Sequence, residues 1–334
     1  MRRAAIRRTM AIGVPMIALA ALIVMPWGLR NYGIYLLSLW AVSTIAAMGL
    51  NLTLGYAGQM SLAQAAFLGI GAYATAVLTN LGVPFLLVVP AAIVLAFVVG
   101  LLLGFPALRV QHHYLAFATL GFNVLVYLAI RNEGWLTGGS QGIGQIVGFA
   151  GVPRPTLFGI SFRPNLYFYY LCLGTMCLAT VLVWLLLRSP WGRAFAALRD
   201  NPVRAESLGI DIRAYTLLAF AIGAALGGLA GVLYAPLVSL FDPAPFNLDQ
   251  SLLFLLMVVV GGSGRFWGPH IGAALVTLLP QWLQTWFPNA GADRWYLLAF
   301  GLTVMVLLTW CPGGLLTIPQ RLRAMVVGER ARTP

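Results

Sequence analysis

Residues 188–213, RSPWGRAFAALRDNPVRAESLGIDIR, form the one long charged stretch in a chain that is otherwise strongly apolar. They carry eight of the 28 charged side chains, which comprise 20 basic and 8 acidic residues. Because one apolar run ends at Leu187 and the next begins at Ala214, the stretch is predicted to be a polar loop between two membrane spans. Within it, 193–198 and 203–208 are two short helix-forming runs, separated by the turn Asp200-Asn201-Pro202 and stopped by Gly209. The pattern leaves two interpretations open, a solvated connection or a docking element for another protein.

The composition of the whole chain indicates a membrane protein. In 334 residues, 60% are hydrophobic and 8% are charged, and the mean hydropathy is +0.89. These values predict a single integral membrane domain over 1–334. The net charge of +12 does not indicate nucleic-acid binding, because the basic residues flank apolar runs and form no patch with interleaved aromatic residues.

The apolar runs predict an all-α polytopic fold. Ten candidate transmembrane helices lie at 11–29, 32–52, 63–81, 85–107, 114–130, 165–187, 214–237, 252–260, 268–287 and 295–310. The first run is too long for the apolar region of a signal peptide, so we interpret it as an uncleaved span. The eighth is short and ends in glycines, so eight or nine full crossings with a broken or re-entrant segment stay open.

The arginines predict the orientation of these spans. If the N-terminus is cytoplasmic and the chain crosses ten times, fifteen of the 20 arginines face the cytoplasm. Five face outward: Arg30, Arg131, Arg154, Arg163 and Arg294. The positive-inside rule therefore places both termini and the 188–213 loop in the cytoplasm.

A polar stretch at 50–64, LNLTLGYAGQMSLAQ, interrupts the second and third apolar runs. It is either a cytoplasmic turn or a broken helix that dips into the membrane. Unpaired polar groups are costly in hydrocarbon, so the stretch should face protein or a water-filled path. The small residues of 69–74 serve equally well for close helix packing or for substrate contact. The residues predicted to border a translocation path are Asn51, Tyr56, Gln59, Ser61, Gln64 and Tyr73.

The chain offers little chemistry for an enzyme. None of the predicted spans holds a carboxylate near its centre, which disfavours an ion-driven carrier. The three histidines show no metal-ligand spacing and the three cysteines no Cys-x-x-Cys pattern, so we expect neither a metal nor a cofactor on this chain. The glycine-rich run 261–269, GGSGRFWGP, is predicted to be a turn between helices, because a phosphate-binding loop needs a lysine and this chain has none.

Three motifs in order resemble the branched-chain amino acid ABC transporter permeases of LivM type. The first is GYAGQMSL at 55–62 with GIGAY at 69–73, the second runs from SPWGRA at 189–194 to AESLGID at 205–211, and the third is GGSGRFWGP at 261–269. Members of that family commonly have Gly-His where this chain has Ala63-Gln64. That departure puts in doubt any role of the histidine in the path and the identity of the solute.

The resemblance implies the permease subunit of an importer in a bacterial inner membrane. Its implied partners are a homologous second membrane subunit, two cytoplasmic ATPase subunits that use the ATP, and a periplasmic or extracellular solute-binding protein. The 188–213 loop would then be the coupling loop that contacts an ATPase through Arg193, Phe195, Arg199, Asp200, Arg204 and Glu206. Such permeases carry branched-chain and other amino acids, and related members carry urea or amides. The alternative from another class is an ion-coupled carrier or channel that works without nucleotide.

Overall fold

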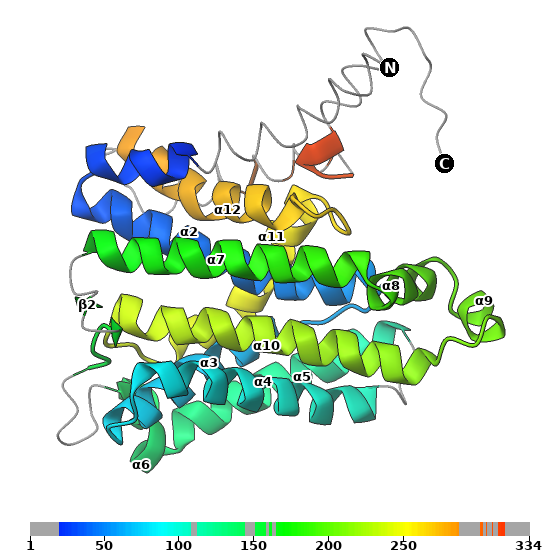
Figure 1. The fold of residues 1–334 in the computed structure, drawn as a ribbon. Coiled ribbons are helices and arrows are strands. Elements are labelled where there is room, and N and C mark those ends of the chain that lie inside the picture. Colours follow the sequence, from blue (N-terminus) through cyan, green and yellow to red (C-terminus); the bar gives the residue numbers. More distant parts are fainter. Residues whose placement is uncertain are drawn as a thin grey trace, which may run out of the picture.

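The computed structural model describes residues 20–107, 112–143, 151–157, 160–161, 165–286, 301–302, 305, 309 and 313–317. Its α-helices are α2 (Asn31–Leu50), α3 (Gln64–Asn80), α4 (Phe85–Ala107), α5 (His112–Asn132), α6 (Gly134–Thr137), α7 (Asn165–Arg188), α8 (Pro190–Asp200), α9 (Pro202–Ser207), α10 (Ile212–Val238), α11 (Leu248–Gly261) and α12 (Gly268–Trp286) (Figure 1). Short 3-10 helices lie at Met25–Gly28, Gly139–Gln141, Ala244–Phe246 and Leu315–Thr317, and η2 (Asn51–Tyr56) is a π-helix. Among the described residues, the one hairpin is formed by β1 (Thr156–Leu157), which pairs antiparallel with β2 (Ile160–Ser161).

The predicted apolar runs correspond to helices wherever the structure describes them. Within the described ranges, five helical segments are long and apolar enough to cross a membrane: Asn31–Tyr56, Phe85–Phe105, Leu115–Asn132, Asn165–Arg188 and Ile212–Val238. Two apolar helices, Leu248–Gly261 and Gly268–Pro280, are shorter, and α3 has 17 residues. The predicted span 11–29 is described only from residue 20 onward, and the predicted span 295–310 lies largely outside the described residues.

Helix α10 lies at the centre of the bundle and has its most extensive contacts with α2, α3 and α4. Glycine residues on both helices allow α3 and α10 to pack closely. A Cβ atom at Gly71 would collide with the backbone of Gly228, and one at Gly231 would collide with the carbonyl oxygen of Leu68. The small residues of 69–74 therefore have the close-packing role that was one of their two interpretations.

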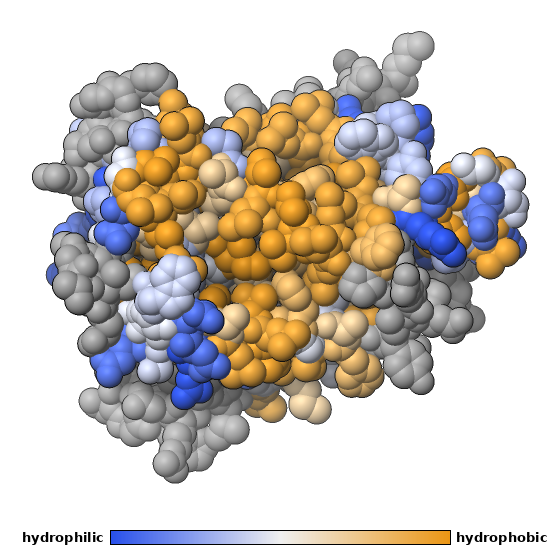
Figure 2. Space-filling view, turned by 90° about the horizontal axis from the view of Figure 1, so that it is seen from below, coloured by the Kyte–Doolittle hydropathy of each residue, from blue (hydrophilic) through white to orange (hydrophobic). Residues whose placement is uncertain are grey.

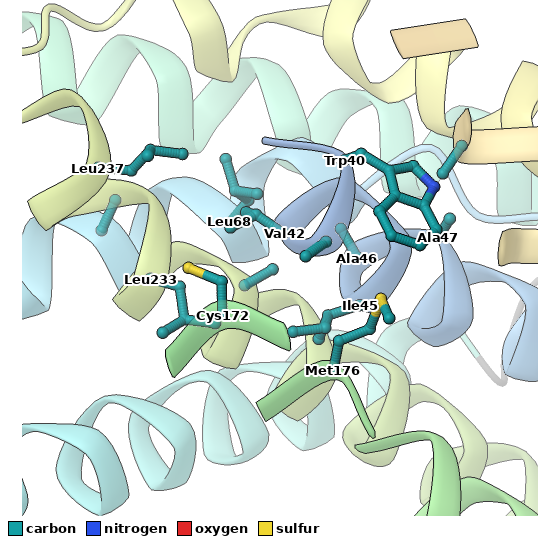
Figure 3. Close-up of a cluster of buried hydrophobic side chains, with 14 of the residues drawn as sticks. Trp40, Val42, Ile45, Ala46, Ala47, Leu68, Cys172, Met176, Leu233 and Leu237 are labelled. Atoms are coloured by element: carbon teal, nitrogen blue, oxygen red, sulfur yellow. The ribbon is translucent and has the colours of Figure 1, made fainter. Parts of the chain in front are cut away.

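The core is formed where α2, α3, α7 and α10 meet. Figure 3 shows Trp40, Val42, Ile45, Ala46 and Ala47 of α2 beside Leu68 of α3, Cys172 and Met176 of α7, and Leu233 and Leu237 of α10. All of these side chains are buried. Helix α2 is therefore enclosed by protein over most of its length.

A broad apolar belt covers the face of the bundle seen in Figure 2, in orange, with hydrophilic residues toward both ends. Only 28%, 22% and 28% of the apolar windows in α4, α5 and α7 are buried, against 78% for the α2–η2 segment and 72% for α10. Large side chains such as Leu102, Phe117 and Leu125 are more than 60% exposed. An apolar surface of this extent is stable only in lipid, so the protein is a polytopic membrane protein.

Candidate functional site

The 188–213 segment forms the predicted pair of helices, α8 and α9, which protrudes at one end of the bundle (Figure 1). Helix α8 starts earlier than predicted because Ser189 Oγ accepts a hydrogen bond from Trp191 N (3.2 Å) and Pro190 occupies the first helical position. Asn201 ends α8 and caps α9, accepting from Arg204 N at 3.0 Å. Gly209, with φ +82°, then allows the chain to turn into α10.

The inner face of α8 is fixed to the bundle by Phe195. This side chain is 0% exposed and lies in an apolar cluster with Leu52, Ala57 and Ala219. Its ring meets that of Tyr215 edge to face, with 6.3 Å between the centroids. Phe195 therefore anchors α8 to η2 and α10 and is not available on the outer surface of the loop.

Arg199 links α8 to the polar stretch. Its Nη1 donates a hydrogen bond to the carbonyl oxygen of Gly55 in η2, at 2.5 Å. Gly58 (φ +70°) lies against the Arg199 backbone, and Gly264 (φ +72°) lies against the guanidinium. A side chain at Gly264 would displace Arg199, so this contact depends on glycine.

Asn51 completes the link to the glycine-rich run. Its Nδ2 donates to the carbonyl oxygen of Arg265 (3.1 Å), and its Oδ1 accepts from Gly264 N (2.9 Å). The run 262–267 is the predicted turn between helices, because α11 ends at Gly261 and α12 begins at Gly268. Three motifs far apart in the sequence thus meet at one end of the bundle: the polar stretch, α8 and the α11–α12 turn.

The polar stretch is a broken helix. Helix α2 continues through η2 to Tyr56, and α3 does not begin until Gln64. In the break, Gln59 N donates to the carbonyl oxygen of Thr53 (2.9 Å), and Ala63 N donates to Ser61 Oγ (3.4 Å). Tyr56 and Gln59 are half-buried, and Ser61 is buried. Wide helical turns of this kind are frequent at functional sites.

Gln64 lies between helices. It is 2% exposed, and its Nε2 donates to the carbonyl oxygens of Ala46 in α2 (2.8 Å) and Gly223 in α10 (3.4 Å). The amide therefore holds the start of α3 against two neighbouring helices. A role for this residue in the translocation path stays a prediction.

Two polar residues that the sequence reasoning missed cap the start of α3, and a third, Asn123, supports one of them. Thr119 Oγ1 accepts from Leu62 N, and Ser251 Oγ accepts from Ala65 N, each at 3.0 Å. Ser251 in turn lies 3.4 Å from Asn123 Oδ1. All three side chains are buried, and the sequence signal that could have found them is a lone polar residue inside an apolar run.

Tyr73 lies apart from the other predicted path residues. Its ring meets those of Phe241 and Phe246 with centroid distances of 5.1 and 5.6 Å. Its hydroxyl is buried and has no hydrogen-bond partner. The structure therefore brings Asn51, Tyr56 and Arg199 together but places Tyr73 in an aromatic cluster farther along α3.

The outer face of α8 and α9 combines charge with exposed apolar side chains. Arg193, Asp200, Arg204 and Glu206 are exposed, as predicted for a loop in water. Val203 is 73% exposed and Leu208 is 79% exposed, and the sequence reasoning did not select either residue. A surface with apolar centres and charged surroundings has the composition of a protein-binding site.

The part of the chain that the structure describes holds no group of three or more His, Cys, Asp or Glu side chains able to bind a metal. Within the same part, Cys172 and Cys177 are free thiols.

Comparison with known proteins assigns the family. Residues 33–308 match the family model described as branched-chain amino acid transport system / permease component. The high-affinity branched-chain amino acid transport system permease protein LivM of Escherichia coli K12 is 32% identical over 309 residues, covering 85% of this chain and 70% of that protein. A probable LivM of Methanocaldococcus jannaschii is 26% identical over 326 residues, covering 83% and 90%. The autoinducer 2 import system permease protein LsrC of Escherichia coli O9:H4 is 27% identical over 202 residues, covering 59% and 54%. No solved structure matches the chain.

The family match covers most of the chain and includes all three motifs that meet at the α8 end. The chain therefore belongs to the family of branched-chain amino acid transport system permease components and is a membrane transport subunit, not an enzyme.

Proposed function

We propose that this chain forms half of the membrane path of an ATP-driven importer for branched-chain amino acids. The other components are a homologous membrane subunit, two cytoplasmic ATPase subunits and a solute-binding protein outside the membrane. Family membership and the substrate named for the LivM relatives support this assignment. ATP hydrolysis belongs to the partner chains, because this chain lacks the lysine of a phosphate-binding loop.

We further propose a bacterial inner-membrane location with ten spans and both termini in the cytoplasm. The distribution of fifteen inner and five outer arginines supports this orientation. It places α8, α9 and the α11–α12 turn at the cytoplasmic end of the bundle. A cysteine introduced at Ser207 should then be protected from an impermeant thiol reagent added outside, and one at Ser140 should react.

The observation that carries the proposal is the two-faced character of α8. Its inner face is fixed to the bundle through Phe195 and Arg199, while α8 and α9 expose charged side chains together with Val203 and Leu208. An ATPase that binds the outer face can therefore move α8, and α8 contacts the broken helix and the α11–α12 turn directly. This arrangement gives a physical route between hydrolysis and the spans.

The test is reconstitution of the complete importer in liposomes. Leu208→Asp should lower ATPase binding and leucine uptake at least tenfold, because it places a charge at the centre of a protein interface. Leu208→Met keeps the apolar contact and should behave like the parent. Leucine uptake by this chain alone, driven by an ion gradient without nucleotide, would refute the proposed function in favour of a secondary carrier.

A further inference from the structure

We propose that the junction between α7 and α8, residues 184–193, binds the phosphate group of an anionic phospholipid through Arg188 and Arg193. The bound lipid would fix the start of α8 to the membrane surface. Figure 1 shows that α8 begins directly at the end of α7, where the apolar span Asn165–Arg188 ends. The inference adds a lipid to the partners of the proposed function. It does not depend on which solute the importer carries.

The chain bends sharply at the junction, which brings Arg193 back to the end of α7. A Cβ atom at Gly192 would collide with the backbone of Leu187, so the close approach of α8 to α7 depends on glycine. Arg193 Nη1 donates to the carbonyl oxygen of Arg188 at 3.5 Å. The two arginines belong to different helices, yet both lie at the bend, and both are exposed.

Arg188 lies at the end of a helix face that is exposed to lipid. At positions i, i+3, i+4 and i+7, this face of α7 holds Val181, Trp184, Leu185 and Arg188. Val181 and Leu185 are more than half exposed, and Trp184 is 39% exposed. Tryptophan is enriched at the boundary between lipid and water, and long basic side chains extend from there to the headgroups. The guanidinium group of Arg188 is therefore at the level of the lipid phosphates.

The ring of Trp184 orders this guanidinium group. Arg188 Cζ lies 3.8 Å from the ring centroid, which is a cation–π contact. A guanidinium stacked on a ring keeps its N–H donors available along its edge. Arginine binds phosphate through two parallel hydrogen bonds in the plane of that edge. Because the stack orders the side chain in advance, less conformational entropy is lost when a phosphate binds.

The junction is cationic and lacks an acidic partner. Between Glu133 and Asp200 the sequence contains no Asp or Glu. In the part of the chain that the structure describes, neither Arg188 nor Arg193 makes an ion pair. A basic residue beside an anionic membrane surface gains about fivefold in affinity. A zwitterionic headgroup brings a positive charge of its own, so the junction favours an anionic lipid.

The position of the junction favours lipid over an ATPase. Arg193 is also among the residues that the sequence predicts to contact an ATPase. However, the junction begins within the span Asn165–Arg188, whereas the exposed apolar residues Val203 and Leu208 lie farther from the span, in and after α9. Trp191, at the start of α8, is 48% exposed and adds a second interfacial ring beside the arginines.

A bound lipid would complete the attachment of α8. Phe195 and Arg199 fix the middle and the end of this helix to the bundle, but its start is exposed at Trp191. A phosphate shared by Arg188 and Arg193 would bridge α7 and α8 across the bend. Movement of α9 would then move α8 as one unit instead of opening the bend. Leucine uptake by the importer should therefore depend on anionic lipid.

The first experiment measures lipid binding to the full chain in detergent by native mass spectrometry. The probe is phosphatidylglycerol, and phosphatidylcholine is the zwitterionic comparison. Arg188→Gln and Arg193→Gln should each lower the affinity for phosphatidylglycerol about fivefold, and the double variant about 25-fold. Arg188→Lys keeps the charge but loses the planar fork, so its affinity should lie between those of the parent and Arg188→Gln. Binding of phosphatidylcholine should not change, which reports an intact fold.

A charge-matched control combines Arg204→Gln with Arg213→Gln. Both arginines are exposed in the same charged stretch but lie in α9 and at the start of α10. This variant loses the same charge, and its affinity for phosphatidylglycerol should stay within about twofold of the parent because the junction is intact. An equal loss in the control and in the Arg188 and Arg193 double variant would overturn the inference, as would parental affinity in that double variant.

The second experiment uses the complete importer in phosphatidylcholine liposomes with and without phosphatidylglycerol. Phosphatidylglycerol should raise leucine uptake by the parent several-fold and should not affect the double variant. Equal uptake by the parent in both membranes would overturn the role of the lipid in holding α8. If Arg193→Gln lowers ATPase binding but not lipid affinity, Arg193 is an ATPase contact and the lipid site is refuted. A parent complex without ATP-dependent leucine uptake would overturn the proposed function but not the lipid affinity, which is measured on this chain alone.

Discussion

Phe195→Ala should detach α8 from the bundle without unfolding the spans. The phenylalanine ring is 0% exposed and is enclosed by Leu52, Ala57, Ala219 and the edge-to-face ring of Tyr215. Truncation of a fully buried phenylalanine costs about 3–5 kcal/mol. Because the other cores of the bundle do not include Phe195, the cost falls on the local contact between α8 and the bundle.

A free-energy change of this size alters the docking equilibrium of α8 by between about 100-fold and a few thousand-fold, since every 1.4 kcal/mol is a factor of ten. The hydrogen bond from Arg199 to Gly55 remains in the variant. It does not compensate, because Arg199 is an exposed residue and a solvent-screened contact contributes about 1 kcal/mol or less. We therefore expect α8 to become undocked in a substantial fraction of molecules.

Hydrogen exchange of the full chain in lipid nanodiscs measures this opening directly. Amides of α8 should exchange at least 100-fold faster in Phe195→Ala than in the parent, while those of α2 and α10 should not change. Phe117→Ala on α5, where the side chain is 70% exposed, is the matched control and should leave α8 unaffected. Exchange of α8 within threefold of the parent would show that Phe195 does not hold the helix. In the complete importer, the same variant should lose leucine uptake while its amount in the membrane persists.

Three further predictions concern the contacts around the broken helix. Arg199→Met removes the hydrogen bond to Gly55. It should lower leucine uptake by the complete importer, though less than Phe195→Ala does, and leave membrane insertion unchanged. Uptake at the parental rate would contradict the role of Arg199 in linking α8 to η2. Gln64→Leu loses the hydrogen bonds to Ala46 and Gly223, each worth about 0.5–1.5 kcal/mol at most, so it should lower the thermal midpoint in detergent only modestly. If Gln64 also borders the path, leucine uptake should fall several-fold more than this stability loss explains, and normal uptake would leave it a packing role alone. Gly71→Val should lower the free energy of unfolding by about 1–3 kcal/mol, because the new side chain collides with α10. The control Gly121→Val meets open space and should lower it by less than about 1 kcal/mol. Equal thermal midpoints for the two variants would refute the close approach of α3 to α10.

The amino-acid sequence by itself determined the class of protein and the positions of its helices. An apolar run of about 20 residues must form a helix in lipid, because its backbone polar groups have no other partner there. Charged side chains are also costly in lipid, so the stretch 188–213 had to lie outside the membrane. The secondary structure within this stretch is also determined by nearby residues. Ser189 and Asn201 cap α8 and α9, and Gly209 ends the second helix in a left-handed turn.

The tertiary structure decided which side chains face inward and which segments meet. Phe195 and Val203 are both apolar residues of the same loop, yet one is buried and the other is 73% exposed. This difference in burial depends on how α8 packs against η2 and α10. The spacing of residues along the loop does not predict that packing. The contacts of Arg199 with Gly55 and of Asn51 with Arg265 join residues 144 and 214 positions apart. Such pairs depend on how the spans pack, and apolar helices without a strong polar face carry little information about their neighbours.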